Sequence, residues 1–365
     1  MRILLSYPSE AELGEGVHFR NVLRRMGHET IEINVAVDSS RVDGAGRVVR
    51  GYPPTVSLTQ LLREHGKVDL YLYIEPMGLI PRDLESSPIP TACVICDCHR
   101  NLKPRQTLAR LFDHVFLYQK NYLTSFVDHP KEAVHWLPYA CDTEFFRDLR
   151  VPRDIDVAFI GKLMGPSSDR RRAIELLSQK YRLNDQRYYT QDEIPRIYSR
   201  AKMVLNIPLA DDLNFRFFEA LSSGALLLTK RIRNGQEELF DEGADYVAFT
   251  TPDEMLAKVD HYLNNQAARE QIAASGYAKV RASHTLEIRV QRLLELIQKG
   301  PRFAAPVRQL SSAQVLALYT SVYERAGQVE ALLRLAAERP DGLIRKIPIL
   351  FAGLKSFARR ATLSW

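Results

Sequence analysis

The chain has 365 residues with a net charge of +6, and its 45% hydrophobic and 26% charged content is ordinary for a folded globular protein. This length exceeds one typical core, so two domains are expected, while no apolar run approaches the ~20 residues that span a bilayer. Residues 302–360 hold ten Lys and Arg against four Asp and Glu, so the rest of the chain is neutral, which argues against a nucleic-acid partner.

Strands and helices alternate through the first third of the chain. The predicted strands are Arg2–Tyr7, Thr30–Val35, Val68–Ile74, Thr91–Ile95 and His114–Tyr118, and the predicted helices are Gly16–Met26, Ser57–His65, Pro104–Phe112 and Asn121–Val127. The alternation indicates a parallel, doubly wound sheet, with the polar segment Asp38–Pro54 as an excursion. The start, MRILLSYPSE, is typical of a first strand and not of a signal peptide, so a cytoplasmic protein is predicted.

The alternation breaks near Leu137 in a turn-rich passage and then resumes. The predicted strands are Ile155–Ile160, Met203–Ile207, Ala225–Thr229 and Tyr246–Phe249, and the predicted helices are Asp169–Tyr181, Gln191–Ala201, 214–223, Pro252–Leu263, Ala267–Ala282 and Thr285–Gln298. Two α/β halves predict two Rossmann-like domains facing across a cleft, residues 1–140 and 141–300, with residues 301–365 as a basic helical tail. Ligands of open α/β sheets bind beyond the carboxyl ends of the strands.

The segment Asn206–Thr229, NIPLADDLNFRFFEALSSGALLLT, carries the most chemistry at such strand ends. Arg216 and Glu219 are three residues apart, so a helix places them on one face near its N-terminal end. Unpaired N–H groups and the positive end of the helix dipole favour a phosphate there. This combination suits a nucleotide diphosphate, although the spacing alone suits a surface ion pair equally well.

The four cysteines, Cys93, Cys96, Cys98 and Cys141, suit a reducing compartment. Three of them lie in or directly after a predicted strand, where side chains alternate between faces, so Cys93 points away from Cys96 and Cys98. No second pair follows at zinc-site spacing. We therefore expect no zinc site.

Four passages in chain order carry a family resemblance. They are LPYACDTEFF at 137–146, DVAFIGKL at 156–163, NFRFFEALSSGALLLT at 214–229 and HTLEIRVQRLL at 284–294. The chain thereby resembles the group-1 family of GT-B glycosyltransferases, which includes the spore-maturation-protein-like bacterial enzymes. Ala140 and Cys141 stand where the family has Gly and a small residue, and residues 1–130 match mainly in strand order. The resemblance implies transfer of a sugar from a nucleotide-diphosphate donor, held mostly by the second domain, to an acceptor hydroxyl.

A nucleotide-diphosphate leaving group needs cations and oriented N–H groups to stabilise its charge. Lys162, which follows Gly161 at a strand end, and Arg216 are the first candidates, with solvated side chains as the alternative. Arg170 begins a helix, where acids are usual, so the basic run Arg170–Arg172 suggests a nearby anion. The cations Lys230, Arg231 and Arg233, also at a strand end, could bind phosphate or simply be solvated.

Glu219 is expected to accept hydrogen bonds from two ribose hydroxyls. Many relatives carry a second Glu eight positions earlier that contacts the donor sugar, but this position holds Asp211, with Asp212 beside it. Asp211 is predicted to be catalytic, although either Asp could instead cap the following helix. Asp212, Asn214 and Phe217 complete the predicted donor-binding residues. The resemblance implies retention of the anomeric configuration, with the shorter Asp211 as a departure.

On the first domain, Gly14 and Gly16 lie between the first strand and its helix, which allows close approach of an anion or sugar. Glu15 and His18 line the same loop. Asp97 and His99 follow the strand Thr91–Ile95, and related enzymes place a His near the donor sugar. Asp97 and His99 are therefore candidate catalytic residues, which could orient the substrate or act as a base toward the acceptor hydroxyl. The alternative for His99 is a purely structural role.

Neither metal nor cofactor is expected besides the donor substrate. Asp154 and Asp156 match a D-x-D string but precede their strand, so they lie at the wrong edge of the sheet for the donor. Two Rossmann-type halves also resemble the metal-independent class.

The tail holds predicted helices over 312–338 and then a different pattern. Apolar residues recur at spacings of three and four from Ile347 to Ala361, with Lys346, Lys355, Arg359 and Arg360 on the other face. A basic amphipathic helix over 343–361 could lie on an anionic membrane surface, which would make the protein peripheral on the inner face of the cytoplasmic membrane. Packing on the body or on a protein partner is the alternative.

The sequence thus predicts a metal-independent glycosyltransferase of bacterial surface glycan or glycoconjugate synthesis, with a glycan, lipid-linked or protein acceptor. Two other classes fit the same architecture: a nucleotide-sugar epimerase and a non-catalytic sugar-nucleotide-binding or assembly protein. Convergence of Lys162, Arg216 and Glu219 in one pocket would favour the transferase.

Overall fold

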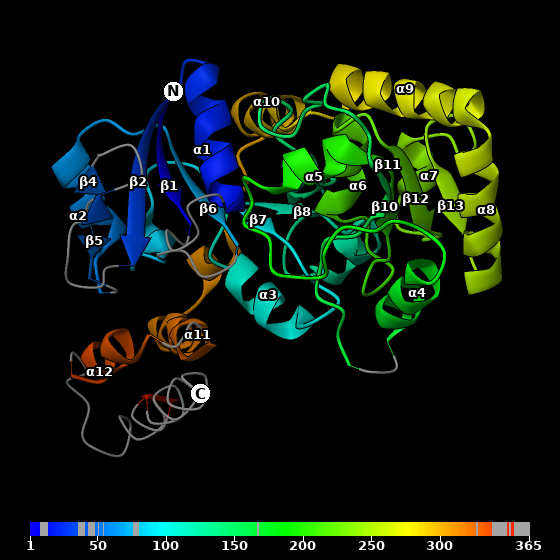
Figure 1. Ribbon diagram of the computed structural model, residues 1–365. Coiled ribbons are helices and arrows are strands. Elements are labelled where there is room, and N and C mark those ends of the chain that lie inside the picture. The colour runs from blue at the N-terminus through cyan, green and yellow to red at the C-terminus, as the bar shows by residue number, and fades with distance from the viewer. Residues whose placement is uncertain are drawn as a thin grey trace. The chain divides into compact units, whose positions relative to one another are not determined.

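The chain divides into two units, each built on its own parallel sheet, in the computed structural model (Figure 1). Unit 1 comprises Met1–Leu137 and Leu293–Trp365, and unit 2 comprises Pro138–Arg292. The structure describes residues 1–7, 14–35, 41–42, 48–49, 51–53, 55–75, 80–165, 168–325, 328–337, 349 and 352–353.

The division runs close to the boundaries expected from the sequence at residues 140 and 300. It differs in one respect, because the chain from Leu293 onward belongs with unit 1 and does not form a separate part. The chain therefore leaves unit 1 near Leu137 and returns to it along helix α10 (Leu286–Lys299).

Unit 1 contains a seven-stranded sheet in the order β5-β2-β1-β6-β7-β8-β9, with every neighbouring pair parallel. Its strands are β1 (Arg2–Ser6), β2 (Glu29–Val35), β5 (Gly51–Tyr52), β6 (Leu70–Ile74), β7 (Thr91–Ile95), β8 (His114–Leu117) and β9 (Val134–Trp136). The helices between them are α1 (Glu15–Arg25), α2 (Leu58–His65) and α3 (Leu102–Ala109), and β3 (Arg41–Val42) pairs separately with β4 (Val48–Val49).

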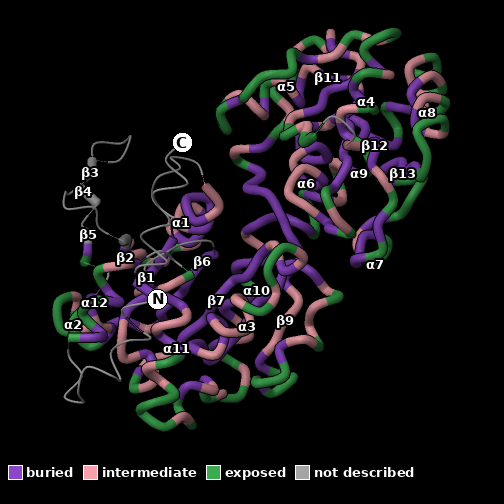
Figure 2. Tube along the Cα trace, turned by 90° about the horizontal axis from the view of Figure 1, so that it is seen from below, coloured by how far each residue is buried: buried purple, intermediate pink, exposed green. Residues whose placement is uncertain are grey.

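The central strands of this sheet are buried along their whole length (Figure 2). The sequences LYLYI in β6 and TACVI in β7 are apolar almost without alternation, as expected for strands covered on both faces. The carboxyl ends of parallel strands share one edge, so the residues that follow β6 and β7 are brought together there.

Helices from the C-terminal part complete the core of unit 1. These are the 3-10 helix η4 (Pro306–Gln309), α11 (Ser312–Arg325) and α12 (Val329–Ala337), so the predicted helices over 312–338 are confirmed. Tyr319 of α11 is buried; its hydroxyl accepts from the Leu84 N–H (3.0 Å) and donates to Glu85 (3.1 Å). The Tyr323 hydroxyl donates to the Ile80 carbonyl (3.2 Å). This segment is part of the unit 1 body.

Unit 2 contains a four-stranded parallel sheet in the order β10-β11-β12-β13. Its strands are β10 (Ile155–Ala158), β11 (Ala201–Asn206), β12 (Leu226–Lys230) and β13 (Val247–Phe249), and its helices are α4 (Asp169–Ser178), α5 (Ile194–Arg200), α6 (Phe215–Ser222), α7 (Gln236–Leu239), α8 (Pro252–Asn264) and α9 (Gln266–Ser283). The predicted α/β class with parallel sheets is confirmed.

Two passages that are far apart in sequence meet in unit 2. The Leu286 N–H donates to the Cys141 carbonyl (3.0 Å), and the buried Arg289 donates from Nε to the Pro138 carbonyl (3.1 Å). Arg289 also contacts His284 Nδ1 at 2.8 Å, and burial followed by the charge of Arg289 lowers the pKa of His284 to about 4. The passages at 137–146 and 284–294 therefore form one polar junction.

The structure differs from the sequence prediction mainly in short elements. Strand β9 was not predicted, because three residues at a sheet edge show too little periodicity to be distinguished from a loop. The predicted helix Asn121–Val127 is a 3-10 helix, η2 (Lys120–Ser125). Its end fits Asp128 and Pro130, which favour a turn.

Among the described residues, no helix has the length and apolar character to cross a membrane. The predicted amphipathic helix over 343–361 lies, apart from Ile349, Ala352 and Gly353, outside the described residues. Its attraction to an anionic surface stays a prediction.

Close packing of α6 against α9 depends on Gly276. A Cβ atom at this position would lie 2.3 Å from the Asp245 carbonyl oxygen and 2.6 Å from Leu221 Cδ2. We expect Gly276→Ala to lower the unfolding free energy by about 1–3 kcal/mol, because the backbone of Asp245 would have to move. Urea unfolding should show this, with Ala274→Leu on the exposed face of α9 as the control that stays within about 0.5 kcal/mol. An unchanged or raised stability in Gly276→Ala would contradict this packing.

Candidate functional site

The Arg216 guanidinium ties two strand ends together in unit 2. Arg216 Nε donates to the Ile160 carbonyl (3.0 Å), which Nη2 also contacts, and Nη1 donates to Oδ1 of Asn206 at the end of β11 (3.1 Å). The guanidinium lies over the Phe159 ring, with Cζ 4.7 Å from the ring centroid. Much of the hydrogen-bonding capacity of Arg216 is therefore used inside the protein.

Asn206 extends this network to α6 and β12. It is 1% exposed, and its Oδ1 also accepts from Asn214 Nδ2 (3.1 Å) while its Nδ2 contacts Thr229 Oγ1 (3.2 Å). Asn214 is the N-cap of α6, where its side chain accepts from the Phe217 N–H (3.3 Å). Asn206 was not predicted as a site residue from the sequence, although an amide that ends a buried apolar strand is a usable signal.

Two further arginines hold the loop that follows β10. Arg170, in the first turn of α4, is buried; it donates from Nε to the Ile207 carbonyl (2.7 Å) and from Nη1 to the Lys162 carbonyl (3.0 Å). Arg171 donates from Nη2 to the Met164 carbonyl (3.3 Å). Arg170 and Arg171 at the start of α4 thus donate to backbone carbonyls of the loop, which explains why these two cations occupy a helix start.

Gly161 is required where the loop passes Arg216. A Cβ atom there would lie 2.4 Å from Arg216 Nη2, so a side chain would displace the guanidinium. The next residue, Lys162, is exposed. In the described part of the chain, no hydrogen bond or ion pair engages the Lys162 ammonium, in contrast to the arginines around it.

The cations at the end of β12 and in the loop after it, Lys230, Arg231 and Arg233, have two kinds of environment. Lys230 pairs with Asp169 (2.6 Å) and Arg231 pairs with Glu242, so both are surface ion pairs. The Arg233 side chain is exposed, and its backbone N–H donates to Asp211 Oδ1 (2.6 Å). The Asp211 carbonyl accepts from Asn234 Nδ2 (3.1 Å), so Asp211 joins the loops that follow β11 and β12.

Glu219 lies one turn after Arg216 on α6 and is half-buried. Burial, and secondly the charge of Glu219, raises the pKa of the Cys141 thiol. Burial also raises the pKa of Tyr198, on which Arg216 and Glu219 act in opposite directions. Arg216 and Glu219 therefore both lie near Tyr198, within one electrostatic environment.

The prediction that Phe217 contacts the donor needs correction. Its side chain is 1% exposed and packs in an aromatic cluster, with ring centroids 5.1 Å from Phe240 and 5.3 Å from Tyr246. It anchors α6 in the core of unit 2. Asp212 is also buried, at 7% exposure, and its N–H donates to the Ala210 carbonyl (2.8 Å).

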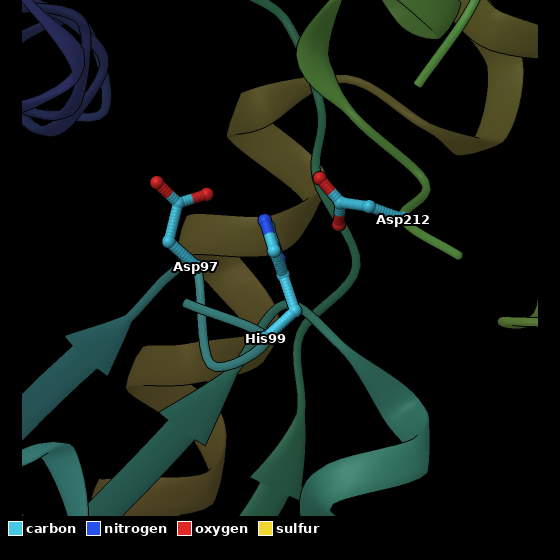
Figure 3. Close-up of side chains that lie close together, drawn as sticks. All are labelled: Asp97, His99 and Asp212. Atoms are coloured by element: carbon cyan, nitrogen blue, oxygen red, sulfur yellow. The ribbon is translucent and has the colours of Figure 1, made fainter. Parts of the chain in front are cut away.

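A second group of polar residues follows β6 and β7 in unit 1. Glu75 comes directly after β6, and its Oε2 accepts from the Cys96 N–H (3.0 Å) and from Arg105 Nε (3.0 Å). Asp97 and His99 lie in the turn after β7 (Figure 3). Glu75 was missed in the sequence, although it follows the apolar run LYLYI just as Lys162 follows its own strand.

Three carboxyl groups act on one another here. Burial, followed by the charges of Glu75 and Asp97, raises the pKa of Glu15 well above its usual range, and Glu15 Oε1 has no hydrogen-bond partner in the ranges described. Burial raises the pKa of Glu75 to about 7, against the opposing effects of Arg105 and the Cys96 N–H. This edge of unit 1 therefore holds two carboxyl groups with raised pKa values, Glu15 and Glu75, and the pKa of Glu75 lies at about 7.

The two glycines of the first loop differ in role. Gly14 is the N-cap residue of α1, where its backbone is extended. Gly16 is buried inside α1, and a Cβ atom there would lie 2.1 Å from Tyr7 Cγ. Gly16 is thus needed for packing against Tyr7, which by itself accounts for the glycine.

The acids of the D-x-D string belong to ion pairs at the start of β10. Asp154 accepts from Arg200 Nε (2.8 Å) and Nη2 (2.6 Å), and Asp156 pairs with Lys202 (2.7 Å). These pairs lie at the amino end of the strand, away from the loop that contains Lys162.

Comparison with known proteins relates this chain to glycosyltransferases. Residues 144–295 match a family described as glycosyl transferase-like. The fold is similar to that of Anabaena HepE solved with UDP and glucose, with a TM-score of 0.61 and 14% identity over 82% of this chain and 100% of that one. None of the curated proteins matches in sequence.

Two other solved structures show the same fold. Sucrose-phosphate synthase from Thermosynechococcus elongatus has a TM-score of 0.55 and 12% identity over 82% of this chain and 98% of that one. An α-glucosyltransferase solved with UDP-glucose and DNA that contains an abasic site has a TM-score of 0.59 and 12% identity over 81% and 99%. At identities this low, the structural similarity shows that the fold is shared.

The raised pKa of Glu75 predicts a pH-dependent stability. A Glu side chain in an unfolded chain titrates near 4.3, whereas folded Glu75 titrates near 7. The folded state binds the proton more tightly, so this stabilisation is complete below about pH 4 and is lost as the pH rises through 7. Between pH 5 and 8 the unfolding free energy should fall by about 2–3 kcal/mol more in the wild type than in Glu75→Gln. Parallel pH profiles of the two proteins in urea unfolding would contradict it.

Proposed function

We propose that this protein, a group-1 GT-B glycosyltransferase, takes its sugar from a nucleotide-diphosphate donor whose phosphates bind at the loop after β10 in unit 2. The single observation that carries the proposal is the contrast around Gly161. Arg170, Arg171 and Arg216 donate to backbone carbonyls, while the ammonium of exposed Lys162 has no partner among the residues described. A fixed loop with one uncommitted cation suits an incoming diphosphate.

The chemistry needs this charge when the bond to the sugar breaks. As the anomeric carbon separates from the phosphate oxygen, negative charge builds on the diphosphate, and an ammonium held nearby stabilises it. The N-terminal end of α6, capped by Asn214, adds a partial positive charge to the same strand ends. Lys162 is therefore proposed to bind phosphate, with Arg216 and Arg170 as the residues that shape its loop.

The remaining roles in unit 2 are proposals of the same kind. Glu219 would accept hydrogen bonds from the ribose hydroxyls, and Asp211 and Asp212 would lie near the donor sugar, with retention of the anomeric configuration as the proposed outcome. In unit 1, Asp97 and His99 are proposed to orient the acceptor hydroxyl or to take its proton. HepE was solved with UDP and glucose and the α-glucosyltransferase with UDP-glucose, so uridine diphosphate is the first donor nucleotide to test.

The biological setting proposed is the cytoplasm of a bacterium, with peripheral attachment to the membrane through residues 343–361. A glycan or lipid-linked acceptor at that surface would place the reaction in surface glycan synthesis. A metal-independent reaction is proposed because the Lys162 ammonium would supply the positive charge that a metal ion supplies elsewhere.

Metal independence predicts an insensitivity to chelation. Addition of excess EDTA should change the rate of UDP release from UDP-glucose by less than twofold. A loss of activity that Mg²⁺ or Mn²⁺ restores would contradict the proposed charge stabilisation by Lys162.

The contrast between Lys162 and Arg216 gives a paired test. Lys162→Ala should weaken UDP binding by roughly 10- to 100-fold, the worth of one charged hydrogen bond, with unfolding free energy unchanged within about 0.5 kcal/mol. Arg216→Ala should lower the unfolding free energy by about 1–3 kcal/mol, because it removes both side-chain donors to the Ile160 carbonyl and one of the two donors to Asn206 Oδ1. Calorimetric titration with UDP and urea unfolding measure the two effects.

The control is Lys180→Ala, an exposed lysine on unit 2 that pairs with Asp260 (2.6 Å) and should bind UDP like the wild type. Failure of the wild type to bind any nucleotide diphosphate in a thermal-shift panel would contradict the proposal. So would a Lys162→Ala variant that binds UDP as tightly as the wild type.

A further inference from the structure

The turn that carries Asp97 and His99 is held by side chains from three different elements. Arg105 of α3 donates from Nε to the Cys96 carbonyl (2.5 Å) and from Nη1 to the Asn101 carbonyl (3.2 Å). Glu75 accepts from the Cys96 N–H, and Gln119, just after β8, accepts from the Cys98 N–H (3.3 Å). Both ends of the segment 96–101 are thus fixed through its backbone.

This turn has a backbone conformation that needs such support. Asp97 has a φ of +49°, in the left-handed region that a non-glycine residue rarely occupies. Such a backbone conformation is unfavourable for a residue with a side chain and persists only when its surroundings enforce it. Cys96 lies directly before Asp97, and its N–H donates to Glu75 while its carbonyl accepts from Arg105. These two hydrogen bonds supply that enforcement.

We infer that Glu75 and Arg105 are a positioning pair, which fixes the orientation of Asp97 and His99 without contacting substrate. The inference rests on the proposed function for the roles of Asp97 and His99. Both partners are largely buried, with side-chain exposures of 11% for Arg105 and 10% for Glu75. A buried ion pair is a weak source of stability compared with apolar packing, so its presence fits a need for orientation.

The ion pair between Glu75 and Arg105 also makes the support of the turn depend on pH. The charged groups that face Glu75 are Arg105 of α3, Asp97 of the turn itself and Glu15 of α1, with the thiol of Cys96 beside them. As the pH falls through about 7, Glu75 gains a proton and its attraction to Arg105 is lost. The rate that depends on Asp97 and His99 should fall with it.

The other end of β7 offers a matched control. Asp113 is a buried carboxylate that accepts from the Thr91 N–H (2.9 Å), from the Ala305 N–H (2.9 Å) and from Arg308 (3.1 Å). It joins the amino end of the strand, whereas Glu75 joins the residues after its carboxyl end. Asp113→Asn therefore removes a comparable charge from the same sheet without touching the turn.

The test uses the full chain as wild type, Glu75→Gln and Asp113→Asn, with Arg105→Lys as a second variant of the pair. The first readout is the set of imidazole resonances of His99 in NMR spectra, identified with His99→Gln. We expect them to shift in Glu75→Gln and Arg105→Lys and to stay unchanged in Asp113→Asn. This readout requires no knowledge of the donor or acceptor.

The second readout is the release of UDP from UDP-glucose. In Glu75→Gln, kcat should fall at least tenfold with KM changed less than twofold, and the acidic limb of the rate profile near pH 7 should disappear. Asp113→Asn should keep kcat within twofold. His99 resonances and kcat that respond alike to Glu75→Gln and Asp113→Asn would overturn the inference. If the wild type releases no UDP, UDP-glucose is not the donor, while the His99 resonances still decide whether the pair fixes the turn.

Discussion

The loop after β10 is held by hydrogen bonds from arginine side chains to its backbone carbonyl groups, and the proposed donor site depends on this loop. Backbone that leaves a sheet has lost its ladder partners, and its carbonyls need other hydrogen-bond donors. Here Arg216, Arg170 and Arg171 supply the donors to the Ile160, Lys162 and Met164 carbonyls. Since these cations donate to the loop, we propose that the charge offered to a donor phosphate comes from the exposed Lys162.

Unit 1 uses the same principle with a different set of residues. The turn after β7 is fixed by Arg105 and Glu75, and the carboxylate is needed because the Cys96 N–H requires an acceptor as well. An arginine alone could serve only carbonyls. Both units therefore hold the segment after a strand with charged side chains that are fully or partly buried. The held segment carries Lys162 in unit 2, and Asp97 and His99 in unit 1.

The sequence was sufficient for the fold class and for most strands and helices, because apolar runs bounded by turn residues have few alternatives. It also indicated that Lys162, Arg216 and Glu219 lie near the carboxyl ends of strands in one sheet, with Arg216 and Glu219 on the helix between two of them. It could not decide whether Arg216 meets a ligand or a carbonyl, because spacing gives the position of a side chain but not the partner of its N–H groups. The burial of Phe217, the clamping role of Glu75 and the return of the chain to unit 1 after Arg292 depend on contacts between distant residues, for which this single sequence provided no signal.

The central claim is that Arg216 shapes the loop while Lys162 grips the donor, and a crystal structure with bound UDP tests it most directly. The account predicts Lys162 Nζ within about 2.7–3.2 Å of a phosphate oxygen, with Arg216 still donating to the Ile160 carbonyl. A complex in which Arg216 has turned from Ile160 to the phosphates, and in which Lys162 points into solvent, would contradict it.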